Sequence, residues 1–258
     1  MNLQQQLTAF KTILIKEMLR FLRIWVQTIL PPAITTGLYF IIFGNLIGER
    51  IGDMDGIRYI DFIIPGLIMM TVITNSYANV VSSFYGVKFQ RSVEEMLVSP
   101  MPNYLSLLGL TDGGVARGLI VGIVVTLISF LFSSEIGFAH PVLTLVIVIL
   151  TAILFSLAGF INAVYAQSFD DISIIPTFVL TPLTYLGGVF YSISLLPEFW
   201  QTASLANPVL YMVNAFRYGI LGISDINIGT ALLIILGFII ALFSFSLSLL
   251  NRGIGIRN

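Results

Sequence analysis

Few residues of this sequence could do chemistry, and their spacing favours none of the usual catalytic sites. Asp53 and Asp55, in the run D-M-D-G, are carboxylates that could bind a cation. They stand between Arg50 and Arg58, which favours ordinary surface charge. His140 is the only histidine, and neither H-E-x-x-H nor G-x-S-x-G occurs. The sequence therefore lacks the residues that metalloproteases and serine hydrolases use for catalysis.

Nucleotide hydrolysis and thiol chemistry also lack their residues. The only lysines are Lys11, Lys16 and Lys88, and none ends a G-x-x-x-x-G-K-[ST] loop. The sequence contains no cysteine, which excludes disulfides, zinc–thiolate sites and iron–sulfur clusters. We therefore expect no catalytic residue, no metal and no cofactor in this chain.

The composition predicts a membrane protein. Of 258 residues, 57% are hydrophobic and 10% are charged, and the mean hydropathy is +0.98. A soluble domain has roughly 25% charged residues. The 12 Lys and Arg and 13 Asp and Glu cannot cover a soluble surface, so lipid must be the outer solvent. The net charge of −1 and the lack of a basic tract argue against a nucleic-acid partner.

Six apolar stretches are long enough to cross a bilayer. A hydrocarbon core of roughly 30 Å needs about 20 helical residues, because every backbone amide must find its partner within the helix. We predict an all-α membrane protein in a single domain, 1–258, with spans over 24–48, 62–87, 104–132, 141–165, 172–191 and 226–251. The basic N-terminal segment is too long for a signal peptide, so the first span is retained.

The distribution of Lys and Arg predicts the orientation. An even number of spans puts both termini on one side. That side carries eight basic residues against three on the other, which places both termini in the cytoplasm. The eight are Lys11, Lys16, Arg20, Arg23, Lys88, Arg91, Arg252 and Arg257, and the three are Arg50, Arg58 and Arg217.

The segments before the first span and after the second are predicted to be short helices outside the hydrocarbon. In 3–23, apolar residues recur every three or four positions, with Lys16, Arg20 and Arg23 opposite them. The pattern predicts a helix on the membrane surface or one packed on a partner protein. In 88–103, Ser92 and Glu95 form a capping box, which predicts a short cytoplasmic helix. The apolar face, projected over 3–25, consists of Leu3, Leu7, Phe10, Leu14, Met18, Phe21 and Trp25.

Polar and small residues within the spans are further candidates. Arg117 either snorkels to the boundary or has a function, and Asp112 could pair with it. Asn75, Asn79 and Asn162 either join helices by hydrogen bonds or line a conduit. Gly114, Gly118 and Gly122 are spaced by four, which predicts close approach of another helix.

Residues 192–225 are too long for a turn and too polar for a span. They contain several aromatic residues together with Asn207, Pro208 and Arg217. We predict two short amphipathic helices folded back into the outer leaflet, where aromatic residues are favoured.

Three segments resemble a known family. They are E-E-M-L-V-S-P over 94–100, F-D-D-I-S-I-I-P-T-F-V-L-T-P-L-T-Y-L-G-G-V-F-Y over 169–191, and N-P-V-L-Y-M-V-N-A-F-R-Y-G over 207–219. With the order of spans, they resemble the permease subunit of type-2 ABC exporters across essentially the whole chain. The bacterial subgroup of YadH-like permeases and relatives of the nodulation-factor exporter is the most similar.

The resemblance implies a half-transporter in the bacterial inner membrane. It would homodimerise and recruit two separate ATP-binding cassette ATPase subunits, which bind ATP and Mg. It would export a lipid, a glycan or a hydrophobic compound, from the cytoplasm or the inner leaflet. The N-terminal helix would be the connecting helix, and 192–225 would close the exit. The residues coupling to the ATPase would be Gln90, Arg91, Glu94, Glu95, Met96 and Leu97, with Asp170 and Asp171 in a second contact.

A secondary active transporter is the alternative. It normally needs an ion site at membrane depth, often in broken helices of inverted repeats. The predicted spans contain no Glu, Asp112 is their only Asp, and the two halves show no repeat. A membrane-embedded enzyme is the third possibility, and the absence of catalytic groups disfavours it.

Overall fold

A computed structural model describes residues 1–54, 56–93, 100–133 and 136–255. Asp55 and Arg257 lie outside these ranges. The described part is a bundle of helices, and its only strands are β1 (Asp53–Met54) and β2 (Ile57–Arg58), a short antiparallel hairpin. The all-α membrane fold is confirmed.

Five helical segments in the described part are long and apolar enough to cross a membrane. The first runs from Trp25 to Gly44 and is assembled from consecutive short helices, while the other four are continuous. The four are α5 (Tyr59–Phe89), α7 (Asn103–Ser129), α8 (Pro141–Tyr165) and α13 (Ile228–Arg252). The short helices of the first segment and its extension are α2 (Trp25–Thr28), α3 (Leu30–Tyr39), η1 (Phe40–Ile47) and α4 (Gly48–Ile51).

The expected fifth span, 172–191, is shorter in the structure. It consists of α9 (Asp171–Ile175), the π-helical turn η2 (Pro176–Leu180) and α10 (Thr181–Tyr185). These 15 residues rise about 22 Å at 1.5 Å each, less than the roughly 30 Å of a hydrocarbon core. The chain then turns at Gly188, whose φ of +73° suits glycine. The helix therefore ends six residues before the expected end, and the count of six spans stays a prediction.

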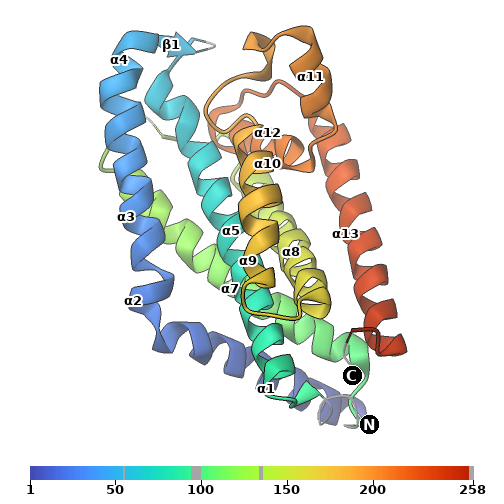
Figure 1. Ribbon diagram of the computed structural model, residues 1–258. Helices are drawn as coiled ribbons and strands as arrows, with labels where there is room; N and C mark the ends of the chain where they lie inside the picture. The colour runs from blue at the N-terminus through green and yellow to red at the C-terminus, as the bar shows by residue number, and fades with distance from the viewer. Residues whose placement is uncertain (55, 94–99, 134–135, 256–258) are drawn as a thin grey trace.

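The two ends of the bundle differ in what they carry (Figure 1). Both chain termini and α1 (Leu3–Arg23) lie at one end, which we call the terminal end. The strand β1 and the helices α11 (Glu198–Leu205) and α12 (Pro208–Leu221) lie at the opposite, distal end. A 3₁₀ turn, η3 (Ile193–Leu195), precedes α11. The two short helices expected within 192–225 are thus present, as α11 and α12.

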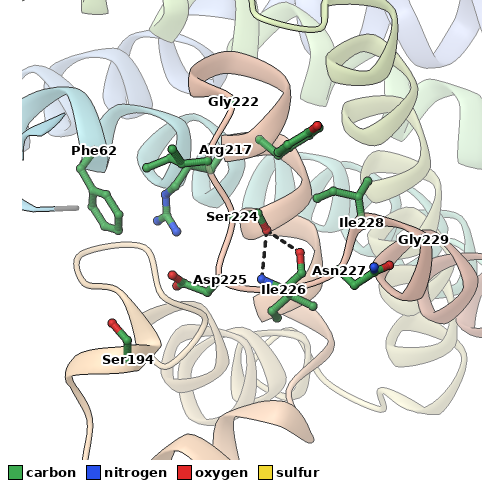
Figure 2. A pocket seen from close by; sticks show the side chains of 12 residues that line it. Phe62, Ser194, Arg217, Gly222, Ser224, Asp225, Ile226, Asn227, Ile228 and Gly229 are labelled. Carbon is green, nitrogen blue, oxygen red and sulfur yellow. Dashed lines mark hydrogen bonds between the residues drawn. The ribbon is translucent and has the colours of Figure 1, made fainter. Parts of the chain in front are cut away.

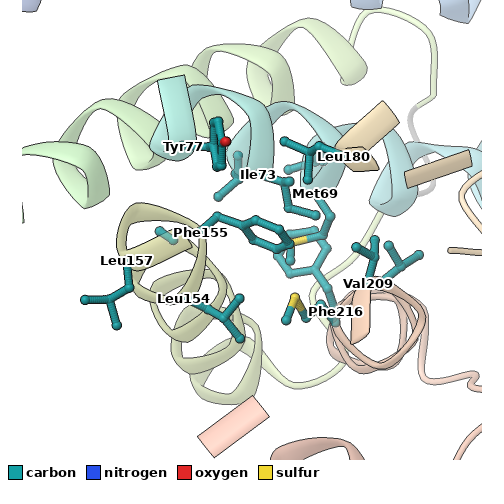
Figure 3. Close-up of a cluster of buried hydrophobic side chains, with 14 of the residues drawn as sticks. Met69, Ile73, Tyr77, Leu154, Phe155, Leu157, Leu180, Val209 and Phe216 are labelled. Carbon is teal, nitrogen blue, oxygen red and sulfur yellow. The ribbon is translucent and has the colours of Figure 1, made fainter. Parts of the chain in front are cut away.

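Helix α5 is the centre of the bundle. In its most apolar stretch 83% of residues are buried, against 17% in α13, which faces outward. The core joins α5 to α8, η2 and α12 (Figure 3). It includes Met69, Ile73, Tyr77, Leu154, Phe155, Leu157, Leu180, Val209 and Phe216.

The glycines spaced by four on α7 face α5. A Cβ on Gly122 would stand 2.8 Å from Cγ2 of Val72, and one on Gly118 would overlap the hydroxyl of Ser76. A Cβ on Gly114 would meet Val80 at 2.7 Å. The α5 residues are themselves spaced by four, so two matching ridges lie in contact. Glycine suits these positions because a Cβ would meet side-chain atoms of α5 and, at Gly114, also the Ser156 hydroxyl of α8 and the Ser76 backbone oxygen.

Candidate functional site

A buried polar cluster joins α1 to α5 at the terminal end. The Glu17 side chain is only 1% exposed, and its Oε2 accepts bonds from Nε and Nη2 of Arg20 at 3.2 and 3.1 Å. Its Oε1 accepts from the Ser83 hydroxyl at 2.7 Å. Arg20 Nη2 also donates to the backbone oxygen and to Oδ1 of Asn79, at 2.8 and 2.9 Å. Every charged atom of the pair thus has a partner, which a buried ion pair requires.

The predicted orientation of Arg20 is wrong. The pattern of 3–23 placed Arg20 on the face toward the cytosol, whereas the structure turns it into the bundle. The reason is the pairing with Glu17 three residues away, a spacing that brings side chains together on a helix. The buried face of α1 follows Ile13, Glu17 and Phe21, and a Cβ on Gly109 or Gly113 of α7 would collide with Ile13 or Glu17.

Polar residues inside the spans lie in contacts between helices. Arg117 Nη2 of α7 donates to Oδ1 of Asn75 on α5 at 3.1 Å. Arg117 and Asp112 form no ion pair in the described part of the chain. Asn79 is fully buried and meets Arg20 of α1. Asn162 Nδ2 of α8 donates to the backbone oxygen of Ile172 in α9 at 3.2 Å. These three asparagines are therefore placed where they join helices.

Lys88 joins the end of α5 to the end of α8. Its Nζ donates to the backbone oxygens of Val164 and Ala166, at 2.6 and 2.8 Å. A cation at the carboxyl end of a helix is favoured because it meets unpaired carbonyls and the negative end of the helix dipole. The ammonium group therefore fixes the end of α8 to the last turn of α5.

An aromatic cluster covers the same junction. The Phe169 ring lies 4.8 Å from that of Tyr85 and 5.0 Å from that of Phe89, between ring centroids. Phe89 is 64% exposed and Phe169 is 53% exposed. Two large aromatic side chains exposed in contact with each other at the ends of helices make this a candidate surface for a partner. We call Tyr85, Phe89 and Phe169 the aromatic junction.

Asp170 and Asp171 were both expected to contact the ATPase, but the Asp171 side chain instead makes hydrogen bonds within its own loop. Its Oδ2 accepts from the backbone N–H groups of Gln167 and Ser168 at 2.8 and 3.0 Å, and its own N–H donates to Ser168 Oγ at 3.1 Å. Hydrogen bonds from the Gln167 backbone and from Ser168 hold the pKa of Asp171 below its ordinary value. Asp170, by contrast, is exposed beside the aromatic junction.

The expected coupling segment 88–103 is described only in part. Gln90 is the capping residue just after α5, and Arg91 follows with a φ of +58°. The Ser92 N–H donates to the Val87 oxygen at 3.1 Å. A left-handed residue after a helix turns the chain sharply. Glu94, Glu95, Met96 and Leu97 lie outside the described residues, so their coupling role stays a prediction.

At the distal end, Arg217 is buried rather than outside the bundle. It is 1% exposed, donates to the backbone oxygen of Gly188, and places its Cζ 3.9 Å from the centre of the Phe62 ring. Arg217 thus lies at the end opposite the termini, as counted from the sequence, but it is buried there because α12 packs its side chain inward. Asn207 caps α12 by accepting from Val209 N–H and donates to the Leu183 oxygen, and Pro208 is the first helical residue.

A pocket of about 750 Å³ opens beside Arg217 and Asp225 (Figure 2). Asp225 Oδ1 accepts from Ser192 Oγ at 2.8 Å, and its N–H donates to Oδ1 of Asn214 at 3.1 Å. These bonds fix the connection between α12 and α13 against the chain that leaves α10. The pocket is thus part of a rigid distal cap.

Sequence reasoning missed Glu17, Lys88 and Asp225 as organising residues. The sequence did contain a sign of the role of Glu17. It lies midway between the apolar residues Ile13 and Phe21, at a spacing of four, and Arg20 follows three residues later. Lys88 and Asp225 had none, because their partners are backbone atoms and residues far along the chain.

Comparison with known proteins identifies the family. The ABC-2 type transporter family matches residues 8–221. The chain is 59% identical over 252 residues to the inner membrane transport permease YadH of Escherichia coli (strain K12), with 97% of each chain covered. It is 24% identical over 221 residues to Nodulation protein J of Rhizobium leguminosarum bv. viciae, with 83% of each covered. With the helical bundle described above, these matches show that the chain belongs to the ABC-2 type transporter family and is a membrane subunit of an ABC transporter.

Proposed function

We propose that this chain is the permease subunit of an ATP-binding cassette exporter in the bacterial inner membrane. Two copies and two separate ATPase subunits form the transporter, which moves a lipid, a glycan or a hydrophobic compound outward. Both termini face the cytoplasm. The family match over most of the chain carries the proposal, and the relative described as an inner membrane transport permease supports the location.

Features of the terminal end support our proposal that the ATPase contact lies there. Phe89 and Phe169 of the aromatic junction are exposed there, next to Gln90, Arg91 and Asp170. Lys88 joins the end of α5 to the end of α8, so a force applied to one of these helices reaches the other. A push at this end would therefore move the central helix as a rigid body, the kind of motion that packed bundles allow.

The exposed apolar side chains of the short segment α9–η2–α10 support our proposal that a second copy of the chain packs there. Ile174, Ile175, Phe178 and Val179 are exposed, and Phe178 is 74% exposed. A segment shorter than the bilayer and apolar on most sides gains from being covered by protein. We place the dimer contact there.

The connecting helix α1 moves with the bundle in this mechanism. The Glu17–Arg20 cluster and the contacts of Gly109 and Gly113 bind α1 tightly to α5 and α7. ATP-driven closure of the ATPase subunits would tilt each half-transporter as one unit and open a path between the halves.

Reconstitution with the ATPase subunit tests the proposal. The permease, purified with an ATP-binding cassette ATPase subunit from the same organism, should retain that subunit and raise its ATPase rate in liposomes. Phe169→Ala should lower the stimulated rate, because it removes an exposed contact of the aromatic junction. Phe199→Ala is the control, since Phe199 is 73% exposed but belongs to α11 at the distal end. Transport by the permease without an ATPase subunit would refute the proposal. So would an ATPase rate that is the same with and without the permease.

A further inference from the structure

A pocket of about 540 Å³ opens at the terminal end, beside the aromatic junction. Three separate parts of the chain form it, namely the end of α5 with Arg91, the end of α8 with the loop after it, and the tail that follows α13. Two of its lining residues are cations, and no carboxylate of the described residues lines it. We therefore call it the basic pocket. Its lining includes Tyr85, Lys88, Phe89, Arg91, Tyr165 and Gly255.

The three walls of the basic pocket meet at one carbonyl group. The backbone oxygen of Val164, at the end of α8, accepts a hydrogen bond from Lys88 Nζ at 2.6 Å. The same oxygen lies against the tail, because a Cβ on Gly255 would stand 2.7 Å from it. The tail reaches this position through a left-handed turn at Gly253, whose φ is +64°. The folded chain therefore fixes all three segments around the pocket.

The positive charge of the basic pocket is not balanced by the described part of the chain. Lys88 has three N–H donors, and two of them bind backbone oxygens at the end of α8. Arg91 is exposed, and its guanidinium makes no hydrogen bond or ion pair with any residue that the structure describes. The nearby acids Asp170 and Asp171 do not line the pocket. An anion in the pocket would therefore gain from both cations.

Arg91 stands in a backbone conformation that glycine would adopt at lower cost. Its φ is +58°, and among the described residues it is the one non-glycine residue with a positive φ. A Cβ in the left-handed region strains the chain. Strained residues of this kind gather at functional sites. An arginine here costs stability, and its guanidinium gains no contact within the described chain, which points to a partner outside it.

The location of the basic pocket favours a protein as that partner. Asp61 and Lys88, near the two ends of α5, are about 40 Å apart along the helix, whereas the hydrocarbon core is roughly 30 Å thick. The end of α5 thus extends beyond the hydrocarbon. Phe89 and Tyr165 line the pocket and are 64% and 53% exposed. Exposed aromatic rings beside an arginine are typical of the centre of protein–protein interfaces.

We propose that the basic pocket receives an acidic side chain of the ATPase subunit, an inference that rests on the function proposed above. The carboxylate accepts hydrogen bonds from the Arg91 guanidinium and from the third N–H of Lys88. Apolar residues beside it in the ATPase subunit pack on Phe89 and Tyr165. The tail after α13 is then a third part of the ATPase contact, beside the segments that follow α5 and α8.

The affinity of an ATPase subunit from the same organism for the permease in nanodiscs tests the pocket. Arg91→Glu should weaken this binding at least about tenfold, since a charge-assisted hydrogen bond becomes a repulsion. Arg91→Gly should also weaken it, while the unfolding midpoint of the permease does not fall, because glycine relieves the strain. Arg252→Glu is the matched control and should change the affinity less than about threefold. Arg252 is an exposed cation at the same end and does not line the pocket.

A charge-reversal experiment identifies the acidic partner. With Arg91→Glu in the permease, changing the surface acids of the ATPase subunit to lysine one at a time should restore binding at one position. Equal losses of affinity in Arg91→Glu and Arg252→Glu would overturn this inference and leave the proposed function standing. An unmodified permease that binds no ATPase subunit would refute both. If Arg91→Glu keeps its ATPase affinity but the permease alone loses phosphatidylglycerol, the pocket binds lipid and the inference is wrong.

Discussion

Removing Arg20 should destabilise the protein far more than removing a similar charge elsewhere on α1. Arg20→Met leaves the Glu17 carboxylate, 1% exposed, with the Ser83 hydroxyl as its one remaining partner among the described residues. Breaking a buried ion pair on one side costs about 3–5 kcal/mol. We expect about 3 kcal/mol, the lower value, because the Arg20 side chain is itself 30% exposed and water reaches the pair. Arg23→Met, on the exposed Arg23, should cost less than about 0.5 kcal/mol.

A double-mutant cycle isolates the pair from the other bonds of Arg20. Glu17→Gln alone keeps an acceptor for Arg20 and should cost about 1–2 kcal/mol. The double variant has no buried charge, so it should lose only about 2 kcal/mol, less than the sum of the single losses. The bonds from Arg20 to Asn79 are lost both in Arg20→Met and in the double variant, and therefore cancel.

Equilibrium unfolding in mixed micelles gives the free energies for the cycle. A local measurement follows from the absence of cysteine in the sequence. A single Ile13→Cys, half-buried where α1 contacts Gly109, should react slowly with a maleimide. Adding Arg20→Met should speed the reaction if α1 lifts from the bundle. Single losses that add to the double loss within about 0.5 kcal/mol would show that Glu17 and Arg20 do not interact, and the cluster would not be what fixes α1.

Three further predictions concern packing and the terminal end. Gly118→Ala should cost more than about 1 kcal/mol of unfolding free energy, because the new methyl overlaps α5, whereas Gly237→Ala, with open space around it, should be neutral or stabilising. Lys88→Met should cost about 1–2 kcal/mol in the same unfolding experiment, because the carbonyls that end α8 lose their donor, and a loss under about 0.3 kcal/mol would contradict the capping role. The lowered pKa of Asp171 means that its contribution to stability is complete above its ordinary value of 3.8 and is lost as pH falls through the lowered value. Asp171→Asn should therefore speed hydrogen exchange of the loop after α8 at neutral pH, whereas Asp170→Asn should leave it unchanged.

The positions of the long helices follow from the sequence because lipid leaves the backbone few choices. Hydropathy alone placed the fourth span over 141–165, and α8 has these bounds. The spacing of Gly114, Gly118 and Gly122 predicted a close helix contact. It could not name the partner, because the matching ridge on α5 is defined only by how the two helices cross.

The remaining differences come from tertiary contacts. The apolar run of the fifth span continues to residue 191, so hydropathy extended the helix beyond Tyr185, where the turn at Gly188 and the packing of α12 end it. Arg20 and Arg217 look like surface charges in the sequence. The distant Gly188 holds Arg217 inward, whereas Arg20 is held by the distant Asn79 and by Glu17, the one partner that the local spacing could have indicated. The coupling residues Glu94 to Leu97 lie outside the described part, and their role stays a prediction.

The length of the segment from Asp171 to Tyr185 has a consequence for the lipid around it. Acyl chains beside a helix several ångströms too short must tilt or compress, at a fraction of a kcal/mol for each ångström of mismatch. The bilayer is therefore expected to dimple next to this segment wherever protein does not cover it. A dimple brings the two headgroup layers closer together, which shortens the distance that a polar headgroup must travel through hydrocarbon at that place.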